Sequence, residues 1–251
     1  MNKMKTLVML ALVCFFATAV NAQVKKPAVK KATTTKVPVK KPTTVKKAAP
    51  LVKKEVKLPG TRVKITTDSG VMIIRLYDKT PQHRDNFIKL ASEHFFDSLL
   101  FHRVIQGFMI QGGDPQSKYA QPGQMLGMGD VGYTIPAEFD TSLFHKKGAL
   151  AAARTPNPAK ASSGCQFYIV QGNKLTDADL NNMEMQKGIK YSAAQRNTYK
   201  TIGGTPFLDM DYTVFGEVEK GLEVIDKIAS VPKGPGDRPL ADVRMKIEVI
   251  K

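Results

Sequence analysis

The stretch that decides the fold is FHRVIQGFMIQGGD, residues 101–114. It is mainly apolar, yet it carries one permanently cationic side chain, Arg103, and the amide of Gln111. Phe108 and Met109 stand between these two polar residues. Short apolar runs recur along the chain at 99–111, 148–153, 166–171, 212–218 and 243–250. Runs of this length, bounded by turn-forming residues, predict β-strands.

The residues before this stretch predict a β-hairpin. Residues 62–66 alternate polar and apolar side chains, as a half-buried strand does, and residues 71–77 form a second strand-like run. Asp68-Ser69-Gly70 lies between the two runs and favours a turn.

Two amphipathic helices complete the main pattern. Thr80 as N-cap and Pro81 at the first helical position predict one helix start. Its apolar face holds Phe87, Leu90, Ala91 and His94, and the face of a second helix at 219–230 holds Leu222, Ile225, Ile228 and Ala229. Many short strands with two main helices predict one mainly β domain over residues 59–251, folded as a closed antiparallel barrel.

Residues 172–205 do not fit a barrel strand pattern and predict a helical insertion in one loop. Thr176, followed by Asp177 and Asp179, has the composition of a helix start. Gly188 indicates a stop, and residues 192–200 predict a further helix.

Residues 1–22 predict a signal peptide. Lys3 and Lys5 precede an apolar run at 7–20, which is short for a membrane span, and Ala22 provides a cleavage site. A retained N-terminal anchor is the alternative. The expected location of the mature protein is therefore outside the cytoplasm, in the periplasm.

The net charge of +16 belongs mostly to a tail. Residues 23–58 carry +11 of it, from twelve Lys against one Glu, and residues 1–22 carry +2, which leaves +3 for residues 59–251. The tail is rich in Lys and Pro and has no aromatic residue, so it is predicted to be a disordered linker. It is either a spacer or an electrostatic tether to anionic envelope surfaces. A nearly neutral domain argues against nucleic-acid binding.

Several classes of site are not predicted. The four His show no metal-ligand spacing, and no phosphate-binding glycine loop or hydrolase motif is present, so no metal or cofactor is expected. After removal of the signal peptide Cys165 is the one cysteine, which is expected to be buried rather than reactive. His102 is expected to be structural rather than an acid–base catalyst.

The order of the motifs resembles the cyclophilin-type peptidyl-prolyl cis–trans isomerases, and the likeness covers nearly all of residues 61–251. The motifs are residues 101–114, GCQFYIV at 164–170, FLD at 207–209 and YTVFGEV at 212–218. The resemblance implies an eight-stranded closed antiparallel barrel capped by two helices. It also implies isomerisation of X–Pro bonds, and the predicted signal peptide makes exported polypeptides the expected substrates. A monomer is expected, because nothing in the sequence demands a larger assembly.

The resemblance assigns roles to eleven residues. Arg103 and Gln111 are expected to be catalytic, with Arg103 stabilising a twisted amide. Substrate-binding roles fall to Phe108, Met109, Ala153, Arg154, Gln166, Tyr168, Phe207, Leu208 and Tyr212. If 164–170 is a strand, Gln166 and Tyr168 face the pocket while Phe167 enters the core. Plain core packing is the alternative for Phe108 and Met109.

The chain departs from the usual family pattern at the rim of the site. Tyr168 stands where a phenylalanine is usual, and Tyr212 replaces a histidine. Phe207 replaces the tryptophan of many eukaryotic members, so weak cyclosporin binding is expected. Ala153-Arg154-Thr155 replaces Ala-Asn-Ala, and the turn within 121–133 is altered. A proline-peptide-binding chaperone module with little turnover is the alternative function.

Overall fold

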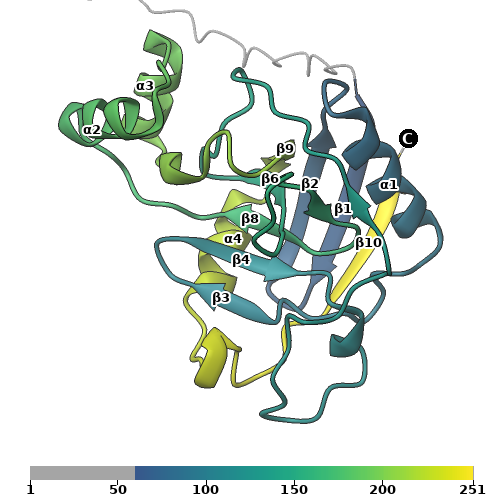
Figure 1. The fold of residues 1–251 in the computed structure, drawn as a ribbon. Coiled ribbons are helices and arrows are strands. Elements are labelled where there is room, and N and C mark those ends of the chain that lie inside the picture. Colours follow the sequence, from purple (N-terminus) through teal and green to yellow (C-terminus); the bar gives the residue numbers. More distant parts are fainter. Residues whose placement is uncertain (1–59, 251) are drawn as a thin grey trace, which may run out of the picture. The chain divides into compact units, whose positions relative to one another are not determined.

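Residues 60–250 are described by the computed structural model of the chain; the predicted signal peptide and the linker at 23–58 lie outside them. The main sheet has eight antiparallel strands (Figure 1). They are β1 (Arg62–Thr67), β2 (Gly70–Leu76), β3 (Arg103–Ile105), β4 (Met109–Gly112), β6 (Ala149–Ala152), β8 (Phe167–Val170), β9 (Val214–Lys220) and β10 (Met245–Ile250). Two short strands, β5 (Thr134–Ile135) and β7 (Ser162–Ser163), pair separately. The predicted hairpin at 62–77 is confirmed by the pairing of β1 with β2.

The sheet is curled but open, so a closed barrel is not confirmed. The strand order is β10-β1-β2-β9-β6-β8-β4-β3, which leaves β10 and β3 as the two edges. Backbone hydrogen bonds join these edges only at one end, where Ser98 N donates to Met245 O at 2.9 Å and Phe101 N donates to Val243 O at 2.9 Å. The chain before β3 makes these bonds, whereas β3 itself does not pair with β10.

Side chains that alternate along the central strands divide into two apolar clusters. Ile110, Phe167 and Ile169 enter the main core, whereas Met109 and Tyr168 enter a smaller cluster on the other face. The ring of Phe167 makes edge-on contacts with the core phenylalanines Phe87, Phe96 and Phe101. The predicted division between Phe167 and Tyr168 is therefore confirmed.

Helices α1 (Pro81–Ser92) and α4 (Leu222–Ala229) also contribute side chains to the main core. Helix α1 packs against β9 and β10, and α4 packs against β2, β3 and β4. The carboxylate of Glu138 caps α1 by accepting from the backbone N–H of Gln82 and His83, while the Thr80 side chain makes no capping bond. His94 does not lie on the apolar face as predicted, because α1 ends at Ser92 and the chain turns at His94 with a φ of 56°.

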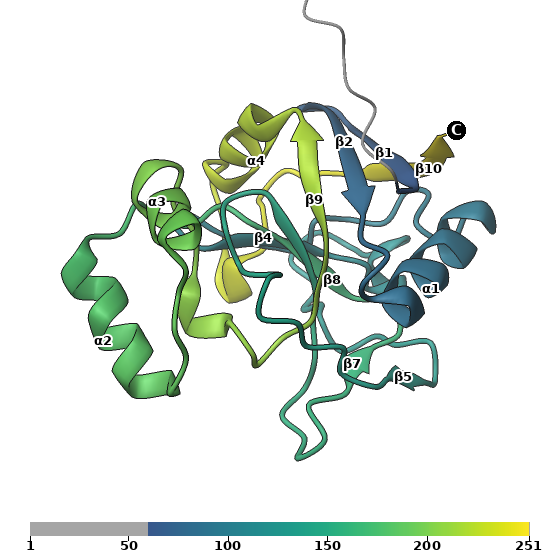
Figure 2. The same cartoon turned by 90° about the horizontal axis from the view of Figure 1, so that it is seen from above.

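Helices α2 (Asp177–Lys187) and α3 (Ala193–Thr201) lie between β8 and β9, where the helical insertion was predicted. Figure 2 shows the pair at one side of the sheet, away from α1. Both helices begin with a reciprocal capping box, Thr176 with Asp179 and Ser192 with Gln195. Gly188 ends α2 in the left-handed conformation at a φ of 64°. None of the helices in 60–250 has the length and hydropathy needed to span a bilayer.

Candidate active site

The site is built on one row of residues that crosses four strands. Arg103 of β3 pairs with Gln111 of β4, Gln111 pairs with Tyr168 of β8, and Tyr168 pairs with Ala151 of β6. Partners in register present their side chains on the same face of a sheet. The strand ladder therefore brings Arg103, Gln111 and Tyr168 together although they are far apart in the sequence.

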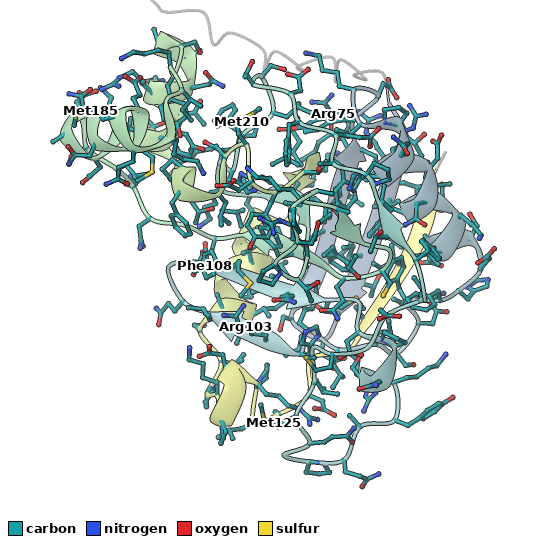
Figure 3. The ribbon with its side chains drawn as sticks, viewed as in Figure 1. Arg75, Arg103, Phe108, Met125, Met185 and Met210 are labelled. Atoms are coloured by element: carbon teal, nitrogen blue, oxygen red, sulfur yellow. The ribbon has the colours of Figure 1, made fainter. Side chains whose placement is uncertain are left out.

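This face holds a pocket of about 180 Å³ that is lined by both polar and apolar side chains. Nine of the eleven predicted site residues line it: Arg103, Phe108, Met109, Gln111, Ala153, Arg154, Tyr168, Leu208 and Tyr212. Figure 3 shows Arg103 and Phe108 on neighbouring parts of the β3–β4 hairpin. Phe207 does not line the pocket; it is 49% exposed, and its ring centre lies 5.5 Å from that of Phe108.

A second, wider pocket of about 450 Å³ adjoins the first. Gln111, Ala153 and Arg154 line both pockets, so they form the wall between them. Gln166 lines only the wider pocket, which continues over residues 127–134. The two pockets therefore lie side by side on this face, and together they are called the groove.

A chain of amide hydrogen bonds orients the polar groups of the groove. Arg103 Nη1 donates to Gln111 Oε1 at 3.3 Å, and Gln111 Nε2 donates to Gln166 Oε1 at 3.0 Å. Gln166 Nε2 then donates to the carbonyls of Gly127 and Gly129, at 3.0 and 2.7 Å. Each amide accepts through its oxygen and donates through its nitrogen, which fixes its orientation. The side chain of Arg103 is 42% exposed, and its nearest carboxylate oxygen is Asp237 Oδ2 at 3.9 Å.

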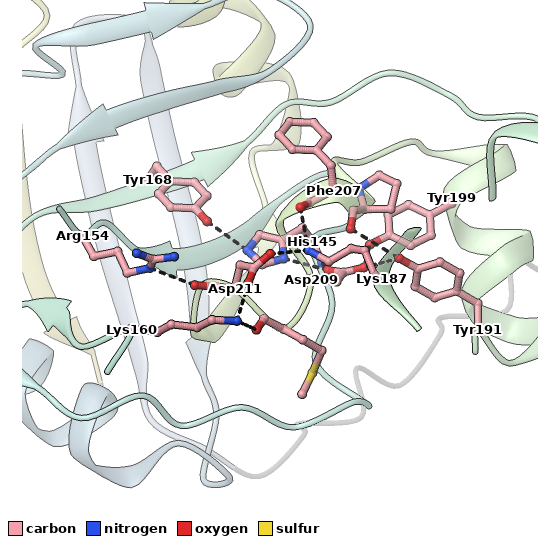
Figure 4. Close-up of polar contacts among 12 residues, drawn as sticks. His145, Arg154, Lys160, Tyr168, Lys187, Tyr191, Tyr199, Phe207, Asp209 and Asp211 are labelled. Atoms are coloured by element: carbon pink, nitrogen blue, oxygen red, sulfur yellow. Dashed lines mark hydrogen bonds and ion pairs between the residues drawn. The ribbon is translucent and has the colours of Figure 1, made fainter. Parts of the chain in front are cut away.

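The hydroxyl of Tyr168 connects the pocket to a buried polar network that the sequence reasoning missed (Figure 4). His145 Nε2 lies 2.9 Å from this hydroxyl, and His145 Nδ1 lies 2.7 Å from Asp209 Oδ1. When Nδ1 donates to the carboxylate, Nε2 of the neutral ring accepts from the Tyr168 hydroxyl. The expected need of this hydroxyl for a partner is therefore met. Burial raises the pKa of Tyr168 well above its ordinary value, so the hydroxyl stays protonated.

The other end of this network lies in the helical insertion. Tyr191 and Tyr199 donate their hydroxyls to Asp209 Oδ2, at 2.9 and 2.6 Å. Asp209 was visible in the motif at 207–209, but nothing in the sequence linked it to His145 or to the two tyrosines.

A second network lies at the pocket rim, also drawn in Figure 4. The carboxylate of Asp211 accepts from Lys160 and from Lys187 of α2, at 2.5 Å each. Arg154 Nε donates to the backbone carbonyl of Asp211 at 3.0 Å, and its guanidinium lies over the Tyr212 ring, 4.6 Å from the ring centre. These contacts fix the cation of Arg154 at the wall between the two pockets.

Two residues predicted to be structural lie outside both pockets. Cys165 is buried, and burial raises the pKa of its thiol to about 11, so the thiolate form is rare at neutral pH. His102 is also buried, and burial lowers its pKa to about 4. Residues 60–250 contain no cluster of three or more His, Cys, Asp or Glu side chains that could hold a metal ion.

Comparisons with known proteins identify the family of the chain. The family model described as cyclophilin type peptidyl-prolyl cis-trans isomerase/CLD matches residues 62–249. A Staphylococcus aureus protein named as a peptidyl-prolyl cis-trans isomerase is 34% identical over 195 residues, covering 77% of this chain and 93% of the relative. A Streptococcus pyogenes protein named as a bifunctional phosphatase/peptidyl-prolyl cis-trans isomerase is 36% identical over 204 residues; the match covers 77% of this chain but only 41% of that protein.

Solved structures show the same fold. A cyclophilin type peptidyl-prolyl cis-trans isomerase of Cryptosporidium parvum superposes with a TM-score of 0.56 at 22% identity, over 76% of this chain and 98% of that one. The family model spans the strands that carry the groove as well as the two helices of the main core. The chain therefore belongs to the cyclophilin-type peptidyl-prolyl cis-trans isomerases.

Proposed function

We propose that this domain accelerates the isomerisation of X–Pro bonds in exported proteins while they fold. The observation that carries the proposal is that Arg103, hydrogen-bonded to Gln111, lines a pocket of about 180 Å³ together with Phe108 and other apolar side chains. A structure of the Cryptosporidium parvum cyclophilin was determined in the presence of the dipeptide Ala-Pro. That structure supports proline-containing polypeptides as the substrate class of this chain.

The reaction breaks no covalent bond. Rotation about the peptide C–N bond faces a barrier of about 18–20 kcal/mol because conjugation is lost in the twisted amide. Uncatalysed X–Pro exchange therefore takes tens to hundreds of seconds. A catalyst has to bind the twisted amide more strongly than either planar form. The twisted nitrogen regains its lone pair, so a fixed cationic donor beside it stabilises the transition state.

The described residues fit this requirement. Phe108 and Leu208, which are partly exposed, provide apolar surface for the proline ring, and Met109 lies buried behind this surface at 1% exposure. Arg103 supplies the cationic donor toward the amide nitrogen. Gln111, held by Gln166, offers a polar contact to the flanking backbone.

The deciding experiment replaces Arg103 and measures isomerisation of a proline peptide by NMR exchange. Arg103→Ala is expected to lower kcat/KM about 100-fold, as loss of one transition-state donor does. Arg103→Lys keeps the charge and should retain more activity than Arg103→Ala. An unchanged rate in folded Arg103→Ala would overturn the mechanism. Peptide binding without any exchange enhancement in the wild type would favour the alternative, a peptide-binding chaperone module.

Export and tethering complete the proposal. Residues 1–22 direct the chain out of the cytoplasm, and the basic segment 23–58 contacts anionic envelope surfaces. Replacing two leucines of the apolar run, Leu7 and Leu10, by Arg is expected to leave the protein in the cytoplasmic fraction. Unaltered export of that variant would contradict the assignment.

A further inference from the structure

Arg154 occupies the wall that the two pockets share. It lines the proline pocket together with Tyr212 and the wider pocket together with Thr155. Its guanidinium is held by the Asp211 carbonyl and by the face of the Tyr212 ring. A side chain fixed in this way loses little conformational entropy when a ligand binds it.

The positive charge of Arg154 has no carboxylate partner within residues 60–250. Asp211 is the acidic residue whose backbone Arg154 contacts, but the Asp211 carboxylate is taken up by Lys160 and Lys187. Three cations therefore surround one anion at this corner of the groove. One of the three, Lys187, comes from helix α2 of the insertion.

The remaining charges of the groove do not neutralise this corner. Arg103 adds a further cation to the lining of the smaller pocket, and its Nε lies 3.9 Å from Asp237 Oδ2. Asp130 lines the wider pocket and accepts a hydrogen bond from the backbone N–H of Gly132 at 2.7 Å. The described residues at the shared wall thus present an excess of positive charge.

From this arrangement we infer that Arg154 makes the enzyme select X–Pro segments with an acidic side chain within two residues of the proline. The inference rests on the proposed function. An extended peptide advances about 3.3 Å per residue, so a proline in the smaller pocket brings a neighbouring side chain to the shared wall. A Glu or Asp carboxylate there forms a charge-assisted hydrogen bond with the guanidinium, whereas a Lys side chain is repelled.

The test uses the full-length mature chain and capped, otherwise neutral peptides that differ at one position. Glu, Gln or Lys is placed at the second residue before proline, the first before it, or the first after it. Isomerisation is followed by NMR exchange, and peptide affinity is measured from chemical shifts in the same samples. At low salt the Glu peptide is expected to exceed the Lys peptide about ten-fold in kcat/KM at one of these positions. The ratio should fall toward one as salt is raised.

Three variants locate the source of the preference. Arg154→Gln is expected to bring the Glu-to-Lys ratio close to one, and Arg154→Lys, which keeps the charge, should retain part of it. Lys187 lines neither pocket, and Lys187→Gln removes one of the two cations that pair with the Asp211 carboxylate. This variant should give an intermediate ratio, because the corner then carries one positive charge less.

The outcomes separate the inference from the proposed function. Isomerisation of all peptides at similar rates would overturn the inference and leave the proposed function standing. Selective binding of the Glu peptide without any rate enhancement would support the selectivity of Arg154 but overturn the proposed isomerase function. A wild-type preference that survives Arg154→Gln in folded protein would also overturn the inference, because another group would then be its source.

Discussion

Tyr168 lines the smaller pocket, and its hydroxyl has a buried hydrogen-bond partner. This hydroxyl is a partner of the buried His145 ring, which in turn contacts the Asp209 carboxylate. A phenylalanine at this position would keep the ring and its packing but would leave His145 Nε2 without its partner. Buried polar atoms that lose a partner destabilise the folded state.

Tyr168→Phe is therefore expected to lower the free energy of unfolding by about 1–3 kcal/mol. Urea denaturation followed by circular dichroism measures the change. Tyr212→Phe is the matched control, because the Tyr212 hydroxyl makes no hydrogen bond within residues 60–250. Equal effects of the two substitutions would show that the His145 contact contributes nothing.

His102 makes the stability of the domain depend on pH. Neither ring nitrogen has a hydrogen-bond partner in the described part of the chain, and burial lowers the pKa of His102 to about 4. In the unfolded chain the pKa is about 6.5, so below that value the unfolded state binds a proton that the folded state does not. The contribution of His102 to the free energy of unfolding is therefore fully present above pH 6.5 and is lost as the pH falls toward 4.

The expected loss between these two pH values is about 3 kcal/mol. Denaturant unfolding at several pH values, compared between the wild type and His102→Gln, isolates this residue, because His83 is common to both proteins. The free energy of unfolding of the variant should change less steeply with pH, by the equivalent of up to one proton taken up on unfolding. An identical slope in the two proteins would rule out His102 as the titrating group.

At the scale of elements, hydrogen bonds join the helical insertion to the segment that lines the smaller pocket. Tyr191 and Tyr199 both donate to the buried carboxylate of Asp209, which is 3% exposed. The segment between the insertion and β9 also carries Leu208 and Tyr212 of the pocket. The insertion therefore contacts the lining of the pocket indirectly, because its two tyrosines bind the same Asp209 carboxylate that orients His145.

Replacing Tyr191 and Tyr199 together by Phe should weaken this support. The loss of two donors to one buried carboxylate is expected to cost about 3–6 kcal/mol of unfolding free energy. It should also shift the NMR resonances of the Tyr168 ring, which lies beyond His145. Tyr119→Phe serves as the control, since Tyr119 is 83% exposed. Unmoved Tyr168 resonances in the double variant would refute the coupling.

The sequence could predict the strands of the site but not the network behind them. Period-two alternation correctly assigned Phe167 to the core and Tyr168 to the pocket face. His145 and Asp209 are 64 residues apart, and no local pattern connects them. Closure of the barrel was predicted from the pattern of strands and helices as well as from the resemblance, whereas the observed edges depend on where the β3 and β10 ladders end. The end of α1 before His94 was missed because helix boundaries are set by contacts with the rest of the fold.

For the whole molecule, the charge is divided between a basic segment and a nearly neutral domain. Twelve lysines lie in residues 23–58, while residues 59–251 carry only +3. Lysines close to an anionic membrane surface contribute about 1 kcal/mol each to binding. The basic segment, and not the domain, is therefore the part expected to bind such surfaces.

Sedimentation with vesicles of anionic and of neutral phospholipid tests this division. The mature chain is expected to bind the anionic vesicles at low salt and to dissociate as the salt concentration rises. A variant with the twelve lysines of 23–58 changed to Gln is the matched control, and it should remain in solution. Equal binding of the two proteins would assign the attraction to the domain instead.

The pairing of β1 with β10 sets the order in which the domain can be completed. Arg62 and Ile250 are register partners, so the first strand of the domain receives its outer neighbour from the last. Contacts between residues so distant in sequence close a large loop and slow folding. Until the final strand has emerged, β1 remains an unpaired edge that can pair with other chains. The domain can therefore reach its native state only when β10 is available to pair with β1. Truncations within β10 should yield aggregation-prone protein.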